Sequence, residues 1–355
     1  MAAKRDKAAE LAKEYPDEEK IMSYRITIAG NLIVDYVKKV DSYPIRGNLS
    51  SILEISRGVG GCACNTSIAL ARLDPSVSVT AIGRVGDDEN GHYIREALKQ
   101  EGINPCISVD SSLPTSFTDV MSDAQGERTF FHARGANAAF CPDDIPFDRL
   151  DCDLFHAGYI LLLDTMDSED EQYGTKLARS LARIRSMGIK TSVDVVSENS
   201  DRFSKLAIPA LKHCDYVIIN ENEASLISGL PARDSSGLIS ESNIRAILEW
   251  LIELGVHEMA SIHTPEGGWA LSRNAGYAFS PSLNLSANHI KGNVGAGDAF
   301  CAGMLYSMCR GFELQYALEV ASGTAACNLT VANATDGLRD FSGVLDIIRQ
   351  RGFRK

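Results

Sequence analysis

The stretch Gly292-Asn-Val-Gly-Ala-Gly-Asp-Ala-Phe-Cys-Ala-Gly-Met-Leu-Tyr-Ser-Met-Cys-Arg-Gly311 carries the strongest local signal in this chain of 355 residues. Residues 296–310 have the apolar periodicity of a helix, and Gly311 is a typical helix stop. The glycines before this helix lack a Cβ, so backbone N–H groups can converge there on a bound group. Because a helix N-terminus adds unpaired donors and partial positive charge, the stretch predicts an anion hole suited to phosphate.

Asp298 falls in the first turn of this predicted helix, and its carboxylate has two interpretations. An acid in a first turn interacts favourably with the helix dipole, which is a purely structural role. A carboxylate beside a phosphate cradle can also accept the proton of an attacking hydroxyl group during phosphoryl transfer. Spacing alone leaves both roles open.

The chain on the N-terminal side of this helix alternates between strands and helices. The predicted strands are residues 25–30, 77–82, 154–163, 190–196, 216–220 and 259–263. The predicted helices are residues 62–73, 91–100, 176–187, 203–211, 223–228 and 243–254. This alternation predicts an α/β fold, a doubly wound and mostly parallel sheet with helices on both faces.

Two segments, residues 36–57 and 115–132, do not fit that alternation. They show short polar–apolar patterns with turn signals, so we expect them to form a small β-sheet lid over the carboxyl edge of the main sheet. Residues 1–24 are mixed in charge and are predicted to be an N-terminal extension. Residues 25–350 then form one α/β domain with the lid segments inserted.

Composition excludes several classes of protein. The net charge of -12 makes general binding to nucleic acid or to an anionic membrane unfavourable. No apolar run approaches the ~18 residues of a membrane-spanning helix, and the N-terminus lacks an apolar signal core, so we expect a cytoplasmic protein. The 9 cysteines fit free thiols, and Cys62-Ala-Cys64, the only close pair, does not by itself favour a metal site.

Gly295-Ala-Gly-Asp298 resembles the C-terminal signature of the ribokinase/PfkB family of carbohydrate kinases. Further matches follow in the family's order: Gly30 with Asp35, Gly60-Gly-Cys-Ala-Cys-Asn65, residues 82–91, residues 135–142 and Asn220-Glu-Asn-Glu223. The resemblance covers about residues 26–350, so residues 25–350 are interpreted as a ribokinase-like kinase domain.

The resemblance implies transfer of the γ-phosphoryl group of ATP to a hydroxymethyl group of a small carbohydrate. Asp298 is then the general base, and the backbone N–H groups of Gly295, Ala296 and Gly297 stabilise the transferring group. Asn220 and Glu223 hold the Mg²⁺–phosphate assembly, Glu223 as a metal ligand acting partly through water. Without the resemblance, Glu223 is interpreted as an acid that stabilises a helix N-terminus.

The same resemblance assigns the substrate to Asp35, Gly61 and Asn65, and Asn137 stands in another family block. Arg134 is a further substrate candidate because of its position at the end of the second lid segment. For Asp35 and Asn65 the alternative role is loop capping. An arginine at position 134 suits an anionic sugar or a phosphate. The alternative for Arg134 and His132 is that they flank a strand on the solvent face, which is the more common place for such residues. Thr264 and Gly267 align loosely with the family's nucleotide-binding segment. Asp194 is either a ligand-facing acid at the carboxyl edge of the sheet or a cap after a strand.

The sequence departs from the family pattern at two places. Gly292-Asn293 replaces an Asp-Thr pair whose acid helps related kinases to coordinate a monovalent cation, so activation by K⁺ is doubtful. Cys62 occupies the position where ribokinase has a lysine.

Other functions remain as alternatives. Gly58-Val-Gly-Gly-Cys-Ala63 fits a dinucleotide fingerprint, but it does not follow the first clear strand. A nucleoside kinase of the same family needs an apolar slot in the lid, for which Tyr36, Phe117 and Phe131 are candidates. A non-catalytic sugar- or nucleotide-binding relative is disfavoured because Asp298 is retained. Homodimerisation through an exposed, association-prone face of the lid is a further hypothesis.

Overall fold

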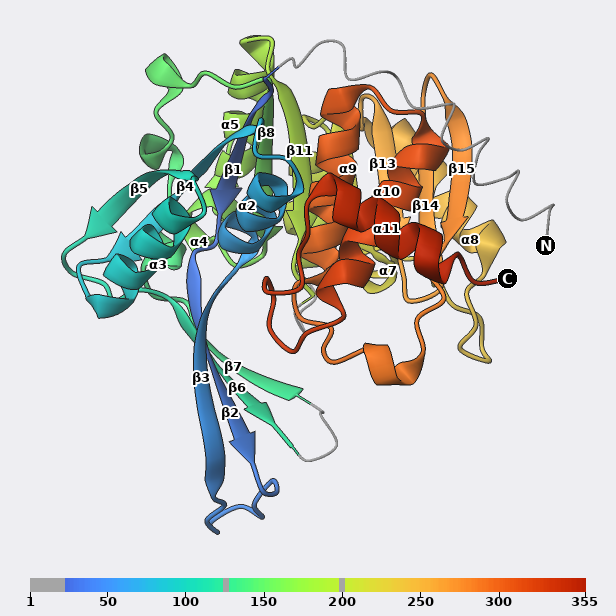
Figure 1. Cartoon of the computed structure of the whole chain (residues 1–355). Coiled ribbons are helices and arrows are strands. Elements are labelled where there is room, and N and C mark those ends of the chain that lie inside the picture. Colours follow the sequence, from blue (N-terminus) through green and yellow to red (C-terminus); the bar gives the residue numbers. More distant parts are fainter. Residues whose placement is uncertain (1–22, 124–127, 198–201) are drawn as a thin grey trace.

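The computed structural model describes residues 23–123, 128–197 and 202–355. The strands of its main sheet are β1 (Arg25–Gly30), β4 (Ser78–Gly86), β5 (Asn104–Asp110), β8 (Leu154–Ile160), β11 (Lys190–Val195), β12 (Tyr216–Asn220), β13 (Met259–His263), β14 (Gly267–Ser272) and β15 (Gly276–Pro281). They form a nine-stranded sheet in the order β15-β14-β13-β12-β11-β8-β1-β4-β5 (Figure 1). The strands from β13 to β5 are parallel. β14 runs antiparallel to its two neighbours β13 and β15, so it alone opposes the other strands, which confirms the mostly parallel sheet.

Helices cover both faces of this sheet, as predicted. One hydrophobic core holds α2 (Cys62–Leu73), α3 (Glu89–Gln100), α9 (Ala296–Arg310), α10 (Leu314–Asn328) and α11 (Phe341–Arg351). The other holds α5 (Lys176–Ser186), α6 (Phe203–Leu211), α7 (Glu221–Ser228) and α8 (Glu241–Leu254). Successive side chains of a strand point to opposite faces, so Ile28 enters the first core and Ala29 the second. Shorter elements are α4 (Asp164–Asp167), the ribbon β9 (Glu169–Asp170) with β10 (Gly174–Thr175), and 3₁₀ turns at Gly135–Ala139, Pro142–Asp144, Phe147–Arg149 and Ala287–His289.

A separate sheet projects from one end of this body (Figure 1). It consists of β2 (Ile33–Val40), β3 (Ile52–Gly60), β6 (Phe117–Ser122) and β7 (Arg128–Ala133), in the order β3-β2-β6-β7. The two hairpin-like pairs are antiparallel, and β2 and β6 join them in a parallel pair. Its strands come from the two segments predicted to form a lid, but β2 begins earlier, at Ile33, and β3 and β7 end later, at Gly60 and Ala133. We call this four-stranded sheet the lid sheet.

The strand order reverses direction between β1 and β8. From β1 the chain passes through α2 to β4 on one side, whereas β8 to β13 build the sheet on the other side. In open α/β sheets, ligands bind beyond the carboxyl ends of the strands at such a switch point. The fold therefore places a binding crevice beside Asn31, which directly follows β1, and Tyr159, the last residue but one of β8.

The expected N-terminal extension lies almost wholly outside the described residues. Within the described part of the chain, no helix is both long and apolar enough to cross a membrane. All 9 cysteines are free thiols.

Candidate active site

A cavity of about 700 Å³ lies at this carboxyl edge, between the main sheet and the lid sheet. Its wall includes Asp35, Thr118, Phe130, His132 and Arg134 from the lid side, the N-cap Gly61 and Asn65 at the start of α2, Tyr159, Asp194, Asn220 and His263 from the sheet edge, and Glu223 from the first turn of α7. The start of α9 completes it with Asn293, Gly295, Gly297, Asp298 and Cys301. Motifs that are far apart in the sequence thus share one cavity.

Asp298 is buried at the start of α9, and both of its carboxylate oxygens accept hydrogen bonds. The Tyr159 hydroxyl donates to Oδ1 over 2.6 Å, and the Asn65 amide donates to Oδ2 over 2.9 Å. Burial, followed by the negative charge of Asp194, raises the pKa of Asp298 to about 6. The carboxylate is therefore oriented, partly desolvated and titratable near neutral pH, as suits a general base.

The backbone before Asp298 has a conformation that only glycine adopts easily. Gly295 has φ 74, and a Cβ there would stand 2.7 Å from the carbonyl oxygen of Ala334. No side chain caps α9 within the described chain, so its first turn is open to a ligand. Of the three residues predicted as oxyanion donors, Gly295 and Gly297 line the cavity, whereas the Ala296 N–H donates to the Asn293 carbonyl over 3.3 Å.

Asp35 and Asn65 bring hydrogen-bond acceptors to the same cavity. Burial raises the pKa of Asp35 to about 6, against a lowering by the hydroxyl group of Thr118. A Cβ on Gly60 would stand 2.2 Å from Asp35 Oδ2, so glycine leaves room for this carboxylate. Asn65 Oδ1 is buried and has no hydrogen-bond partner in the described part of the chain. Both groups can accept hydrogen bonds from ligand hydroxyls.

Arg134 and Asn137, the other predicted substrate residues, are placed differently. Arg134 lines the cavity, and its Nη1 donates to the Leu161 carbonyl over 2.9 Å and to Asp164 Oδ1 over 2.7 Å. Asn137 is fully buried outside the cavity wall. Its amide exchanges two hydrogen bonds of 3.1 Å with the backbone of Leu32. In this structure Asn137 therefore fixes the loop after β1 and does not face a ligand.

Asn220 and Glu223 form a capping box at the start of α7. Glu223 accepts hydrogen bonds from the Asn220 backbone over 3.0 Å, the Asn220 amide over 2.7 Å and the Ser197 hydroxyl over 2.8 Å. Burial raises the pKa of Glu223 to about 8. The capping interpretation is thus realised, but both side chains also line the cavity. The Glu223 carboxylate oxygens already accept hydrogen bonds in the capping box. They are therefore better suited to hold Mg²⁺ through a bridging water than to ligate it directly.

Thr264 and Gly267 do not reach the cavity wall. They close the turn between β13 and β14, where the Thr264 N–H donates to the Gly267 carbonyl over 2.8 Å. His263, just before them, does line the cavity. Burial lowers its pKa to about 4, so the ring is neutral, and it packs 5.0 Å from the Phe300 ring beneath the start of α9.

The cavity also contains residues to which the sequence assigned no role. Tyr159 is the last residue but one of β8, the second strand of the switch point, and its polar hydroxyl at that position is the signal that could have identified it. Asp194 and His132, whose roles the sequence left open, both line the cavity. His132 Nδ1 lies 3.1 Å from the Thr118 hydroxyl.

Comparisons with known proteins agree with this architecture. The family model described as pfkB family carbohydrate kinase matches residues 23–340. The chain is 26% identical over 304 residues to the ATP-dependent ribose-1-phosphate kinase of Halopiger xanaduensis, covering 85% of this chain and 90% of the relative. It is 23% identical to the 5-dehydro-2-deoxygluconokinase of Clostridium perfringens, covering 95% and 96%. Ribokinase of Arabidopsis thaliana, solved with ribose and ATP, superposes with a TM-score of 0.74 at 20% identity, covering 92% of this chain and 99% of that one.

Proposed function

The chain belongs to the pfkB family of carbohydrate kinases, and we propose that it transfers the γ-phosphoryl group of ATP to a hydroxymethyl group of a small carbohydrate. Asp298 acts as the general base in this proposal. The observation that carries it is the position of Asp298, buried at the glycine-rich start of α9 and hydrogen-bonded to Asn65 in the same cavity wall. A phosphate at that helix start and a hydroxyl held by the neighbouring polar groups meet at this carboxylate.

The two substrates occupy opposite sides of Asp298. Asp35, Gly61 and Asn65 bind the carbohydrate hydroxyls from the side of the lid sheet and α2. Asn220, Glu223 and the first turn of α9 face the phosphates. Asp298 accepts the proton of the attacking hydroxyl, and the N–H groups at Gly295 and Gly297 stabilise the charge on the transferring group. Mg²⁺, held by Glu223 through water, neutralises charge on the ATP phosphates when it is bound.

Water exclusion is the second requirement of this chemistry, because ATP must not be hydrolysed. Phe130 and His132 of β7 face the cavity from the lid sheet. Closure of the lid sheet over a bound substrate brings these side chains over the reacting groups and expels solvent.

A nucleoside acceptor is the alternative, and it depends on an aromatic slot for the base. Tyr36 and Phe117 pack on each other with ring centroids 6.3 Å apart, and neither lines the cavity, nor does Phe131. Phe130 does line it and is 57% exposed. One aromatic ring on the cavity wall therefore supports the nucleoside alternative. The carboxylates of Asp35 and Asp298 and the side-chain oxygen of Asn65 support a polyhydroxylated acceptor.

ADP release measured by a coupled assay over a panel of acceptors tests the proposal. The panel contains pentoses, hexoses, ribose 1-phosphate, 5-dehydro-2-deoxygluconate and nucleosides, each with Mg²⁺ and ATP. Turnover with a carbohydrate is the expected result. Turnover with nucleosides alone selects the alternative. Tight sugar binding without turnover of any acceptor overturns the catalytic proposal in favour of a binding protein.

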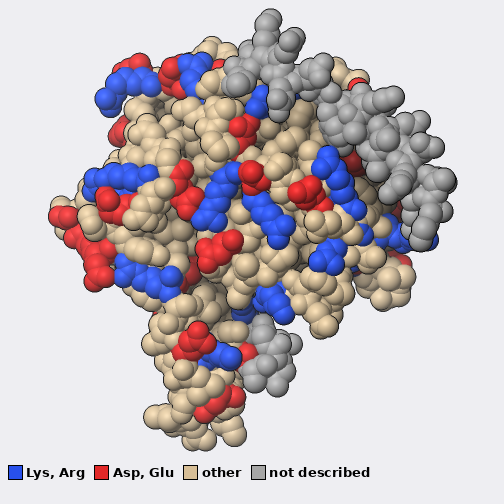
Figure 2. Space-filling view, in the orientation of Figure 1, with Lys and Arg blue, Asp and Glu red and all other residues tan. Residues whose placement is uncertain are grey.

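We also propose that the lid sheets of two chains pair into a homodimer. Large apolar side chains are exposed on the lid sheet and on the loop between β2 and β3: Ile45, Leu49, Leu53, Ile55 and Phe131. Figure 2 shows the lid sheet protruding from a body on which basic and acidic side chains interleave, with much of the lid surface uncharged. Exposed apolar groups concentrated in one projecting element are typical of an interaction surface.

A further inference from the structure

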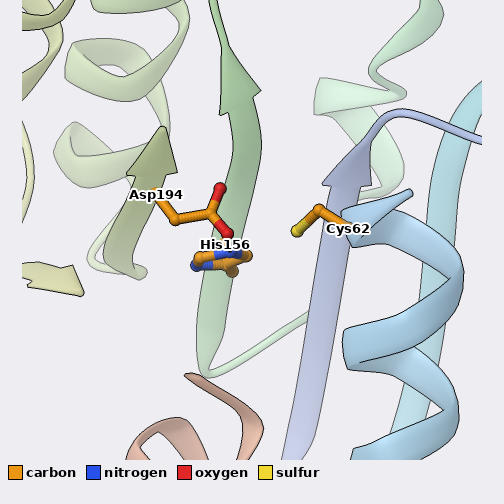
Figure 3. A group of neighbouring side chains, drawn as sticks. All are labelled: Cys62, His156 and Asp194. Carbon is orange, nitrogen blue, oxygen red and sulfur yellow. Dashed lines mark ion pairs between the residues drawn. The ribbon is translucent and has the colours of Figure 1, made fainter. Parts of the chain in front are cut away.

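Three side chains with metal-binding atoms converge beneath the cavity, and the proposed phosphoryl transfer uses none of them. Figure 3 shows Asp194 of β11 and Cys62 of α2 pointing toward each other, with the ring of His156 of β8 next to the Asp194 carboxylate. One ligand atom from each lies within 4.8 Å of those of the other two, and all three residues are buried. We propose that Cys62, His156 and Asp194 form a binding site for Zn²⁺.

The donor set is suited to zinc. Thiolate and imidazole ligands select soft or borderline cations over Mg²⁺, and carboxylate is also common around zinc. Bond lengths of about 2.0–2.3 Å in a tetrahedral site place neighbouring donor atoms roughly 3.3–3.8 Å apart. His156 Nε2 lies 3.7 Å from Asp194 Oδ2, which is within that range. The remaining separations between the three donor atoms are at most 4.8 Å.

The imidazole is oriented as a zinc ligand by its second nitrogen. His156 Nδ1 lies 3.0 Å from the hydroxyl group of Ser192, which leaves Nε2 directed at the cluster. Metal-binding histidines generally have such a partner on the other ring nitrogen. The Cys301 Sγ lies 3.8 Å from the same Nε2, so this thiol is the nearest candidate for a fourth ligand.

Asp194 supplies the independent sign that a ligand is missing. It is 6% exposed, and its Oδ1 has no hydrogen-bond partner in the described part of the chain. An unpaired buried carboxylate oxygen is costly, and a cation beside it removes that cost. Gly158 keeps the space open, since a Cβ there would stand 1.9 Å from Asp194 Oδ1 and 2.7 Å from Cys62 Sγ.

Charge balance favours a cation at this place. The negative charge of Asp194 is the second cause, after burial, of the raised pKa of Asp298. The raised pKa of Cys62 also has Asp194 and Asp298 among its causes after burial. A divalent cation compensates these groups at once, and its binding displaces the thiol proton.

Zinc titration of the metal-free chain tests the inference without ATP, Mg²⁺ or acceptor, so the result is independent of the kinase proposal. The purified full-length chain is stripped with a chelator and titrated with Zn²⁺ against a chromophoric competitor. We expect one tight equivalent per chain. We also expect Co²⁺ to bind in its place with the near-ultraviolet charge-transfer absorption of a thiolate ligand, which tests the thiol without any substitution.

Two substitutions locate the site. Cys62→Ala should weaken Zn²⁺ binding by more than the ~10–100-fold that loss of a second-shell partner costs, and should abolish the thiolate absorption. Cys64→Ala is the matched control, since Cys64 is also buried on α2 but lies outside the cluster, and it should keep both. The inference is overturned if the wild-type chain binds no stoichiometric Zn²⁺, or if Cys62→Ala binds Zn²⁺ and Co²⁺ as the wild type does.

Discussion

At the scale of single residues, Asp298 combines a position that stabilises a helix dipole with hydrogen bonds that orient its carboxylate. Both oxygens are engaged, one by Tyr159 and one by Asn65. A dipole-stabilising acid needs neither bond, because it acts through its charge alone. The two bonds and the shared cavity therefore favour the catalytic role, and substitution separates the roles.

Asp298→Asn should lower kcat by about 10²–10⁴-fold, or roughly 3–5 kcal/mol, because it removes the proton acceptor. The new amide can accept from Asn65 and donate to the Tyr159 hydroxyl, so the local geometry is retained. ATP affinity should stay nearly intact, because the substitution keeps the side-chain size. The loss of one negative charge near the phosphates removes a repulsion and does not weaken ATP binding. Steady-state kinetics and ATP titration of the variant measure both quantities.

The melting temperature of the same variant is the control for this prediction. The pKa of Asp298 is raised in the folded chain, so its ionised form costs stability above about pH 6. The amide removes that cost, and the variant should melt no lower than the wild type at pH 8. A fall in kcat of less than about tenfold with rate-limiting chemistry, or a lower melting temperature at unchanged kcat, would show a structural acid instead of a base.

Tyr159→Phe should move the acid limb of the kcat/KM profile to higher pH. The wild-type limb is expected near pH 6, because the pKa values of both Asp298 and Asp35 are about 6. The Tyr159 hydroxyl lowers the pKa of Asp298 by donating to its charged form, so its removal raises that pKa. At pH 8.5 the variant should recover most of its activity. A limb that stays in place or moves to lower pH contradicts the role given to Tyr159.

At the scale of elements, the start of α9 depends on glycine backbone at Gly295. Gly295→Ala introduces a Cβ at φ 74 and 2.7 Å from a carbonyl oxygen, so the turn must shift. Because the phosphate cradle is made of this backbone, KM for ATP should rise by at least ~10-fold. Initial rates over a series of ATP concentrations measure the change.

Gly311→Ala at the other end of α9 is the matched control. Gly311 has φ 68, so alanine meets the same backbone strain of about 1–2 kcal/mol. Its Cβ would face open space, because no atom lies within 4 Å. This variant should melt at a somewhat lower temperature but keep the KM for ATP. An equal rise of KM in both variants would assign the effect to general destabilisation and not to the cradle.

The elements that the sequence predicts well are those whose pattern matches their burial. The ranges given for α2, α6, α9, β12 and β13 agree with the structure to the residue, because a single apolar face or a continuous apolar run defines each. β14 was missed because its Gly267-Gly268 start reads as a turn, and the half-exposed edge strand β5 was missed because it begins with Asn104-Pro105.

The residues of the candidate site could be predicted where they belong to a local sequence motif. They could not be predicted where only the tertiary fold brings them into the cavity. Asp298, Asn65, Asp35 and Glu223 stand in recognisable spacings, and all four line the cavity. Tyr159 and His263 stand in apolar strands with no motif, and only the sheet order brings them to Asp298 and Gly297. Asn137 fails to reach the wall because its amide is satisfied by backbone, which no sequence pattern reveals.

At the scale of the whole molecule, buried acids give the stability a distinctive pH dependence. The pKa values of Glu223 and Asp167 are raised to about 8 and about 7 in the folded chain. Acids with raised pKa values stabilise the fold while protonated, and this stability is lost as pH rises through the folded values. Buried histidines with lowered pKa values, such as His263, oppose this trend only below about pH 6.5, where unfolded histidine gains its proton.

The melting temperature should therefore fall as pH rises from about 6.5 to 8.5. Glu223→Gln should flatten this fall, because the amide has no charge to desolvate and retains the cap's size. Thermal unfolding of both chains in a series of buffers at constant ionic strength measures the slopes. A melting temperature that rises over this range, or equal slopes in the two chains, would contradict the assignment of buried protonated acids.

The lid sheet makes the last prediction, which concerns assembly. Leu49 is 91% exposed and Ile45 is 78% exposed at its tip, and Leu53 is 62% exposed on β3. Burying such side chains against a second lid sheet gains about 25 cal/mol for each Å² of apolar surface removed from water.

We expect sedimentation equilibrium to show a dimer at micromolar concentration. Leu49→Lys and Leu53→Lys together should give a monomer, because two charges would be buried at the interface without partners. Lys99→Glu on α3, in the body and away from the lid sheet, is the control for altered surface charge and should stay dimeric. A wild-type monomer at micromolar concentration removes the dimer from the proposed assembly, and a double variant that remains dimeric places the interface elsewhere on the molecule.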